Sequence, residues 1–163
     1  KAPPRVKYLG AMAHFKLAQP IYDSFAAIPL TQPLKASLAP KKKAMQLAIS
    51  TYNKVASIGV AEFTTAANYQ QALIYQKLAA DLMNSEKPKS MSDLELEQYT
   101  ILLEEQTEPF NQKAIDIYKA NANLVTQEVY DTFVQKSFAA LAELEPGRYN
   151  KSELVEDAIN EIY

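Results

Sequence analysis

The stretch KKKAMQLAISTYNKVASIGVAEFTTAANYQQALIYQKLAADLM, residues 41–83, decides the fold class. Apolar residues recur every three or four positions in both of its halves, as on one face of a helix. Gly59 stands between the halves and is the residue type that most often ends a helix in the left-handed conformation. Helices joined by so short a turn pack antiparallel. We therefore predict helices over 41–58 and 60–85 that form a hairpin.

The same spacing continues outside this hairpin and predicts an all-α protein. Further helices are expected over 8–27, 93–121, 126–144 and 151–162, and no segment alternates strictly enough to predict a strand. Pro20 and Pro109 fall inside two of these runs, so a kink at Pro20 and a bend near residue 109 are expected. Residues 29–40 contain three prolines and are predicted to be an extended linker, with Pro40 opening the next helix.

The start of the helix over 93–121 has the strongest local signal. Ser92 is a favoured N-cap, and Glu95 three residues later completes a capping box. Met91 and Leu96 flank this box with the spacing of a hydrophobic staple. Thr126 is predicted to cap the helix over 126–144 in the same way.

The composition excludes several classes of function. The chain has 163 residues, no Cys, one His and three Gly, so thiolate catalysis, zinc fingers and disulfide scaffolds are excluded. A net charge of −2 offers no basic field for nucleic acid. No apolar run approaches the roughly 20 residues of a membrane span. We expect no metal, no cofactor and no membrane span in this segment.

The residues that could support catalysis are better explained as surface or packing residues. His14 has no second His or Cys to share a metal, and no glycine-flanked Ser nucleophile accompanies it. Lys41, Lys42 and Lys43 are predicted to be exposed. We therefore expect a protein that is not an enzyme. The same reasoning assigns five carboxylates to the solvated side of one helix, namely Glu95, Glu97, Glu104, Glu105 and Glu108.

A set of Tyr and Asn residues provides the candidate partner-binding site. Tyrosine offers a flat contact surface and asparagine a hydrogen-bonding amide, a combination that suits a peptide groove. Each tyrosine can equally be a spacer between helices with its hydroxyl at the surface. The candidates are Tyr52, Asn53, Asn68, Tyr69, Asn111, Tyr118 and Asn121.

Two resemblances refine the fold. Small and aromatic residues alternate over 66–79 as in tetratricopeptide helices, although the repeat signature that begins with Trp is absent. More specifically, residues 8–151 resemble the C-terminal region of large tetratricopeptide-type proteins of Gram-negative envelopes, some associated with gliding motility and others with TonB and ExbB/ExbD-like energy-transducing systems. The segments that carry this resemblance are 33–38, 60–67, 94–99, 102–106, 109–110, 113–115, 129–131 and 146–149.

The resemblance implies antiparallel helix pairs stacked as a divergent, right-handed tetratricopeptide-like solenoid. Residues 1–163 would be a single helical-repeat domain and, since the chain begins without Met, a C-terminal fragment of a longer solenoid. It further implies a periplasmic or outer-membrane-associated, non-catalytic scaffold that binds other proteins, such as components of energy-transducing complexes.

Two alternatives remain open at this point. The chain can be a structural cap or homo-oligomerisation segment of its parent solenoid. It can also be a carrier of a small ligand or lipid, with an apolar pocket lined by residues such as Phe63, Tyr99 and Phe110.

Overall fold

The computed structural model describes residues 2–151, and within this range the chain is all-helical, as predicted. The predicted helix over 151–162 lies, from residue 152 on, outside the described residues. The elements, in chain order, are α1 (Pro4–Ala26), α2 (Leu34–Ser57), α3 (Ala61–Met83), α4 (Asp93–Ala122), the short 3-10 segment η1 (Asn123–Gln127), α5 (Thr132–Leu144) and α6 (Pro146–Tyr149).

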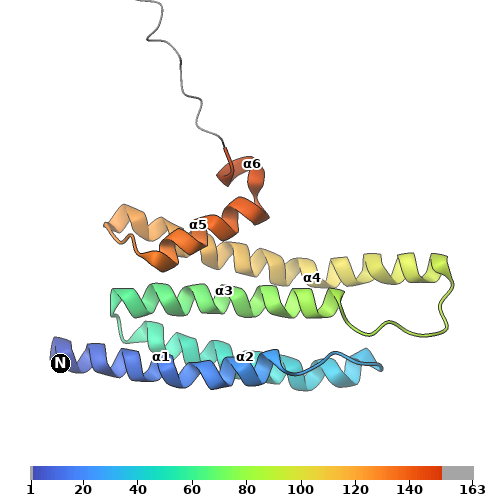
Figure 1. Cartoon of the computed structure of the whole chain (residues 1–163), viewed down its shortest axis with the longest axis horizontal. Coiled ribbons are helices and arrows are strands. Elements are labelled where there is room, and N and C mark those ends of the chain that lie inside the picture. Colours follow the sequence, from blue (N-terminus) through green and yellow to red (C-terminus); the bar gives the residue numbers. More distant parts are fainter. Residues whose placement is uncertain (1, 152–163) are drawn as a thin grey trace, which may run out of the picture.

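Successive long helices run antiparallel and pack side by side, as Figure 1 shows. Each of α1 to α4 contacts the next helix in the chain. In addition, α1 contacts α3 and α3 contacts α5. The helix α3 therefore lies in the middle of the molecule. On one side α3 packs against α1 and α2, and on the other side it packs against α4 and α5.

The turn between α2 and α3 has the predicted form. Gly59 adopts a φ of +76°, in the left-handed region that glycine enters without steric cost. Its N–H donates to the carbonyl of Ala56 at 3.1 Å, which satisfies one of the last free carbonyls of α2. The predicted hairpin is therefore confirmed.

The core consists of two apolar clusters that meet at α3. One joins α1, α2 and α3 around Phe25, Tyr52 and Ile74, and the other joins α3, α4 and α5 around Tyr118 and Leu141. Because α3 packs on both sides, buried residues surround it instead of forming a single stripe. Small residues let its neighbours approach closely, and those with at most 3% exposure are Ala66, Ala67, Ala72 and Ala79.

The prediction of an extended linker over 29–40 is wrong for its second half. The helix α2 begins at Leu34, and Pro40 lies inside it. Pro20 and Pro109 likewise lie within continuous helices. All three prolines are exposed, and so are the residues four positions before them, whose carbonyls lose an N–H partner. Water can satisfy carbonyls on an exposed face, so a helix continues through such a proline.

The predicted helix over 126–144 is wrong at its start. Thr126 belongs to η1, and α5 begins only at Thr132. Asp131 is the true N-cap: its Oδ1 accepts hydrogen bonds from the backbone N–H groups of Phe133 and Val134 at 2.9 and 3.0 Å. An Asp cap is as favourable as a Thr cap, and Asp131 also bonds to another helix, as described below.

The capping box at the start of α4 is confirmed. The Glu95 carboxylate accepts from the Ser92 backbone N–H at 2.8 Å, and Ser92 Oγ accepts from the Glu95 N–H at 3.4 Å. This well-anchored first part of α4 extends beyond the end of α3 (Figure 1). It carries exposed apolar side chains, including Leu94, Ile101 and Leu102.

Candidate functional site: a groove between α3 and α5

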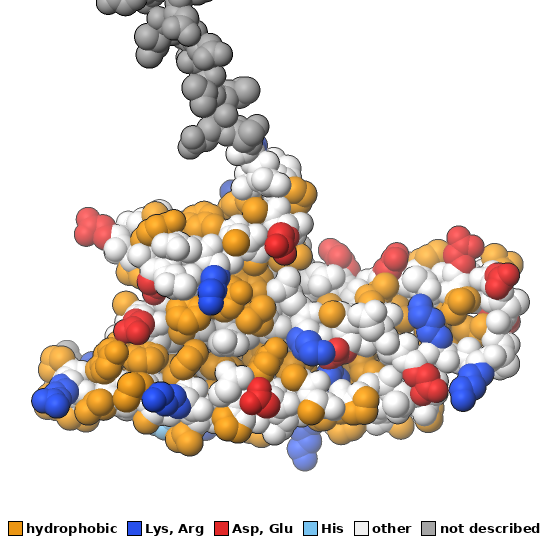
Figure 2. Space-filling view, in the orientation of Figure 1, with side chains coloured by type: hydrophobic (Ala, Val, Ile, Leu, Met, Phe, Trp, Pro, Cys, Tyr) orange, Lys and Arg blue, Asp and Glu red, His pale blue; other side chains and the backbone are white. Residues whose placement is uncertain are grey.

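A groove runs between α3 and α5, with α4 as its floor. Because α3 and α5 both pack on α4, their facing side chains enclose a depression of about 220 Å³. In Figure 2, hydrophobic side chains gather in the hollow between α3 and the part formed by α4 and α5. We call this depression the α3–α5 groove. Its lining residues are Tyr69, Leu73 and Gln76 of α3, Tyr118 of α4, and Lys136, Ala139, Ala140 and Glu143 of α5.

Two tyrosine rings line one end of the groove, and the ring of Phe133 packs beside them. The ring centroid of Tyr69 lies 5.6 Å from that of Tyr118 and 5.9 Å from that of Phe133, at tilted angles typical of attractive ring pairs. Lys136 Nζ lies 5.8 Å from the Tyr69 centroid and 5.3 Å from the Phe133 centroid, within the range of cation–π attraction. The aromatic end therefore also carries a positive charge.

The two tyrosines differ in their access to a partner. Tyr118 is fully buried, and its hydroxyl donates to Gln76 Oε1 at 2.6 Å. Tyr69 is half-buried and borders the open side of the groove. Burial raises the pKa of both hydroxyls, and the Glu143 carboxylate adds to the rise for Tyr69. Both tyrosines therefore stay neutral near pH 7 and act as hydrogen-bonding groups, not as bases.

A buried polar cluster behind the groove holds its walls together. Asn121 has no exposed surface, and its Nδ2 donates to Ser137 Oγ at 3.0 Å on α5 and to the Thr65 carbonyl at 3.2 Å on α3. Asn68 Nδ2 reaches Asn121 Oδ1 at 3.4 Å. Thr65 Oγ1 donates to the Asp131 carboxylate at 2.5 Å. Side chains from α3, α4 and α5 thus share one hydrogen-bond network.

The structure brings only some of the predicted binding residues together. Tyr69 and Tyr118 line the groove, whereas Asn68 and Asn121 form the cluster behind it. Tyr52 lies in the other core cluster with no exposed surface. Packing against neighbouring helices covers the side chains of Tyr52, Tyr118 and Asn121. The set of partner-binding residues stays a prediction, and Tyr69 is its most accessible member in the groove. Asn53 is exposed on α2 and Asn111 half-buried on α4, and neither lines the groove.

Sequence reasoning missed the contribution of α5 to the groove. Lys136, Ala139, Ala140 and Glu143 follow the three- and four-residue spacing of one helix face. The two alanines keep that face low, and the two charges flank it. This spacing was visible in the sequence, but it is equally typical of a helix face packed in a core.

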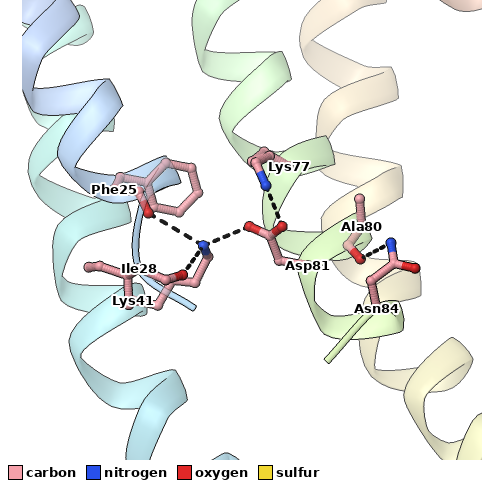
Figure 3. A network of polar contacts seen from close by, with 7 residues as sticks. All are labelled: Phe25, Ile28, Lys41, Lys77, Ala80, Asp81 and Asn84. Atoms are coloured by element: carbon pink, nitrogen blue, oxygen red, sulfur yellow. Dashed lines mark hydrogen bonds and ion pairs between the residues drawn. The ribbon is translucent and has the colours of Figure 1, made fainter. Parts of the chain in front are cut away.

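A second buried polar network lies on the opposite side of α3, and Figure 3 shows it from close by. Lys41 is only 1% exposed, which corrects the prediction that it is a surface residue. Its Nζ donates to the carbonyl of Ile28 at 2.6 Å and that of Phe25 at 3.4 Å, and lies 2.6 Å from Asp81 Oδ2. Lys77 pairs with the other oxygen of Asp81.

This network has a structural role. The carbonyls of Phe25 and Ile28 belong to the last turn of α1 and the residues just after it, where the helix dipole is negative. The Lys41 ammonium therefore caps α1 while Asp81 balances its charge. The hydrogen bonds and ion pairs of Lys41 are all made to other groups of the chain, so its charge is used within the fold.

The remaining candidates for chemistry are separate and exposed. His14 is exposed on α1, and the five glutamates singled out in the sequence are exposed on α4. Among residues 2–151, no three His, Asp or Glu side chains are grouped so that they could hold a metal ion. Nor does any helix in this range combine the length and apolarity needed to cross a membrane.

These features define an all-helical protein with a partly aromatic groove between alternate helices. Comparison with protein-family models, curated proteins and solved structures found no match. The resemblance to tetratricopeptide-type envelope proteins therefore stays a prediction.

Proposed function

We propose that this chain is a non-catalytic scaffold that binds a segment of another protein in the α3–α5 groove. The observation that carries the proposal is the composition of this groove: an open aromatic edge at Tyr69, a wall of small alanine side chains on α5, and two opposite charges at Lys136 and Glu143. Tyrosine edges of this kind are common anchors in protein recognition.

The size and charges of the groove define the segment that fits. A volume of about 220 Å³ is below the roughly 300–1,000 Å³ of most small-molecule pockets and suits one large side chain. Lys136 and Glu143 are seven residues apart on α5, and so lie two turns apart on one face. The preferred segment therefore carries an apolar anchor with an acidic residue toward Lys136 and a basic residue toward Glu143.

The arrangement of the helices supports the wider proposal of a tetratricopeptide-like solenoid. In such an array, alternate helices line one surface and the others back them. Contacts between α1 and α3 and between α3 and α5 agree with this pattern. For location and partner, we extend the proposal to the periplasm or outer membrane and to components of energy-transducing complexes. That extension is supported by the sequence resemblance alone.

The carrier alternative receives less support. Phe63 is 7% exposed, and its ring packs against those of Tyr8 and Phe15 at centroid distances of 5.3 and 6.0 Å. Tyr99 lies elsewhere, with its hydroxyl 3.5 Å from Gln32 Nε2. Aromatic side chains thus fill the space beside Phe63, and the three residues named for a ligand pocket do not surround one cavity.

Photo-crosslinking in cells tests the groove directly. A benzophenone amino acid at Ala139, an exposed groove residue, should give an adduct with another protein that mass spectrometry can identify. The adduct should disappear when Tyr69 is changed to Ala. The same probe at Leu47, exposed on α2, is the matched control and should not give that adduct.

The outcome separates the proposal from its main rival. An adduct that depends on both position 139 and Tyr69 supports peptide binding in the groove. If position 139 gives only adducts with copies of the chain itself, the cap or oligomerisation alternative is correct. If it gives none while the Leu47 probe does, the groove is not the binding surface.

A further inference from the structure

The outer face of α1 carries an apolar stripe with one basic border. Val6, Leu9 and Leu17 are 56%, 48% and 66% exposed, and exposed Ala13 lies between them at helical spacing. At 100° per residue, Arg5 and Lys16 fall on one border of this stripe. No Asp or Glu occurs before Asp23. We call this surface the basic stripe.

The projecting part of α4 carries the opposite arrangement. Leu94, Ile101 and Leu102 are 64%, 49% and 56% exposed. Residues 93–108 include no Lys or Arg. At 100° per residue, Asp93, Glu97, Glu104 and Glu108 fall on one border of the apolar side chains and Glu95 on the other, while Glu105 falls between Leu94 and Leu102. We call this surface the acidic face.

The acidic face also has a hollow. Leu96, Thr100 and Ile101 form the less polar part of a depression of about 470 Å³ along α4, and Asp93, Glu97 and Glu104 supply its carboxylates. In Figure 2, Asp and Glu side chains line the projecting part of α4 with hydrophobic side chains between them. Exposed apolar surface bordered by charge is typical of an interaction site.

We propose that the basic stripe of one copy of this chain docks on the acidic face of a second copy. The two surfaces are complementary in charge: both are exposed helix faces with apolar side chains, Arg5 and Lys16 follow one border of the basic stripe, and six carboxylates lie on the acidic face. Lys87 Nζ lies 3.4 Å from Thr100 Oγ1 at the edge of the acidic face and is the positive charge that the docking contact has to accommodate. Charge complementarity of this kind favours encounter and sets orientation. Leu9 or Leu17 would insert into the hollow beside Ile101, and Arg5 and Lys16 would face the α4 carboxylates.

The geometry makes the contact head-to-tail. The basic stripe and the acidic face are different surfaces on separate helices, and the first half of α1 lies at the opposite end of the molecule from the start of α4 (Figure 1). One copy can therefore use both at once. Contacts of this type form rings or open filaments, not two-fold dimers. This proposal does not depend on the α3–α5 groove, which uses neither surface.

Two variants test this contact, and each of them disrupts one of the two surfaces. Leu17→Glu places a carboxylate in the basic stripe, and Ile101→Lys places an ammonium in the acidic face. Both residues are about half or more exposed, so the fold should survive, which circular dichroism checks. Leu47→Glu, at an exposed position outside both surfaces, is the control. If Leu17→Glu or Ile101→Lys unfolds the chain, Leu9→Glu or Leu94→Lys replaces it.

Sedimentation velocity gives the measurement. The mass of the wild-type chain and of Leu47→Glu should rise above 18.2 kDa with concentration, from about 5 to about 200 µM, and less so at about 0.5 M salt than at about 0.05 M. Each blocked variant alone should stay at the monomer mass. An equimolar mixture of the two should form a dimer and nothing larger, because each retains one complementary surface.

Other outcomes overturn the proposal. A wild-type chain that stays monomeric at low salt, or blocked variants that associate alone, would exclude this contact, and so would a mixture that stays monomeric. If the wild-type monomer instead binds phosphatidylglycerol vesicles and Leu17→Glu abolishes that binding, the basic stripe recognises an anionic lipid surface and not a second copy.

Discussion

Two buried tyrosines occupy similar positions in the two core clusters but differ in one bond. Tyr52 and Tyr118 both have no exposed surface. The Tyr118 hydroxyl donates to Gln76, whereas the Tyr52 hydroxyl has no hydrogen-bond partner among the described residues. An unsatisfied buried hydroxyl costs free energy that a satisfied one does not.

Replacement of each tyrosine by phenylalanine should therefore have opposite effects. Tyr52→Phe removes an unsatisfied group and should raise the free energy of unfolding by about 1 kcal/mol. Tyr118→Phe removes a hydrogen bond, leaves Gln76 without its donor, and should lower it by about 1 kcal/mol. Urea unfolding measures both values. Equal effects of the same sign would show that the two hydroxyls have similar surroundings.

Alkaline pH should destabilise the fold through the same residues. Burial raises the pKa of Tyr52 from 10.0 to about 12. Below pH 10 the hydroxyl is protonated in both states, and stability is unaffected. Between pH 10 and 12 the unfolded chain loses this proton while the folded chain keeps it, so the free energy of unfolding falls, by about 2–3 kcal/mol for Tyr52.

Urea titrations at pH 9 and pH 12 measure this fall, and Tyr52→Phe should reduce it by the share of that residue. Tyr118 should add to it, since its pKa is also raised by burial. A fall of the same size in wild type and Tyr52→Phe would contradict the role of Tyr52.

For single residues, the sequence predicted the helix face on which a side chain lies but not whether that side chain is buried. The spacing of Tyr52, Tyr69 and Tyr118 predicted that each lies on a helix face, yet whether a tyrosine binds a partner or fills the core depends on other helices. The partner of Tyr118 is 42 residues away in the chain. Lys41 was predicted to be exposed because it stands in a run of three lysines. Its burial depends on Asp81, which no local pattern indicates.

At the scale of elements, helical periodicity was sufficient to predict that the helices exist, but not to predict the residues at which they begin and end. The α2–α3 hairpin and the capping box of α4 follow from adjacent residues and were predicted. The starts of α2 and α5 were predicted wrongly. Pro40 was predicted to open α2, which begins at Leu34, and Thr126 to cap α5, which Asp131 caps. Asp131 caps α5 and also accepts from Thr65 on α3, so the tertiary structure favours the later start.

The Lys41 network ties the end of α1 to α2 and α3, and its two charges should respond unequally to mutation. Asp81→Asn leaves a fully buried ammonium without its counter-charge and should lower the free energy of unfolding by about 3 kcal/mol. Lys41→Met should lower it less, because Asp81 is 20% exposed and keeps Lys77.

A double-mutant cycle by urea unfolding checks this prediction, with Gln46→Ala at an exposed position of α2 as a control. The combined variant Lys41→Met with Asp81→Asn should be more stable than Asp81→Asn alone, because it removes the uncompensated charge. Additive losses would show that Lys41 and Asp81 do not interact.

At the scale of the whole molecule, the central position of α3 should govern local stability. Its backbone is covered by α1 and α2 on one side and by α4 and α5 on the other. Opening α3 requires separation of both core clusters, whereas the first turns of α4 lie at the end of the molecule with exposed side chains. Helices with few buried contacts open with low free energy.

Hydrogen exchange with mass spectrometry should therefore find the slowest amides in residues 66–79 and faster exchange in residues 93–102, although both segments are helical. Comparable protection of the two segments would contradict this order. The arrangement itself could not be predicted from the sequence in detail, because several stacking orders bury the same apolar faces. The contacts between α1 and α3 and between α3 and α5 join residues far apart in the sequence, and no local pattern indicates them.

The hydrogen bonds of Asn121 have a consequence for recognition. Since this one amide reaches Thr65 on α3 and Ser137 on α5, the spacing of the groove walls is set before any partner arrives. If the groove binds a protein segment as proposed, the chain would lose little conformational entropy on binding, and most of the ordering cost would fall on the incoming segment. A groove with fixed walls would then favour segments that fit it without any movement of α3 and α5.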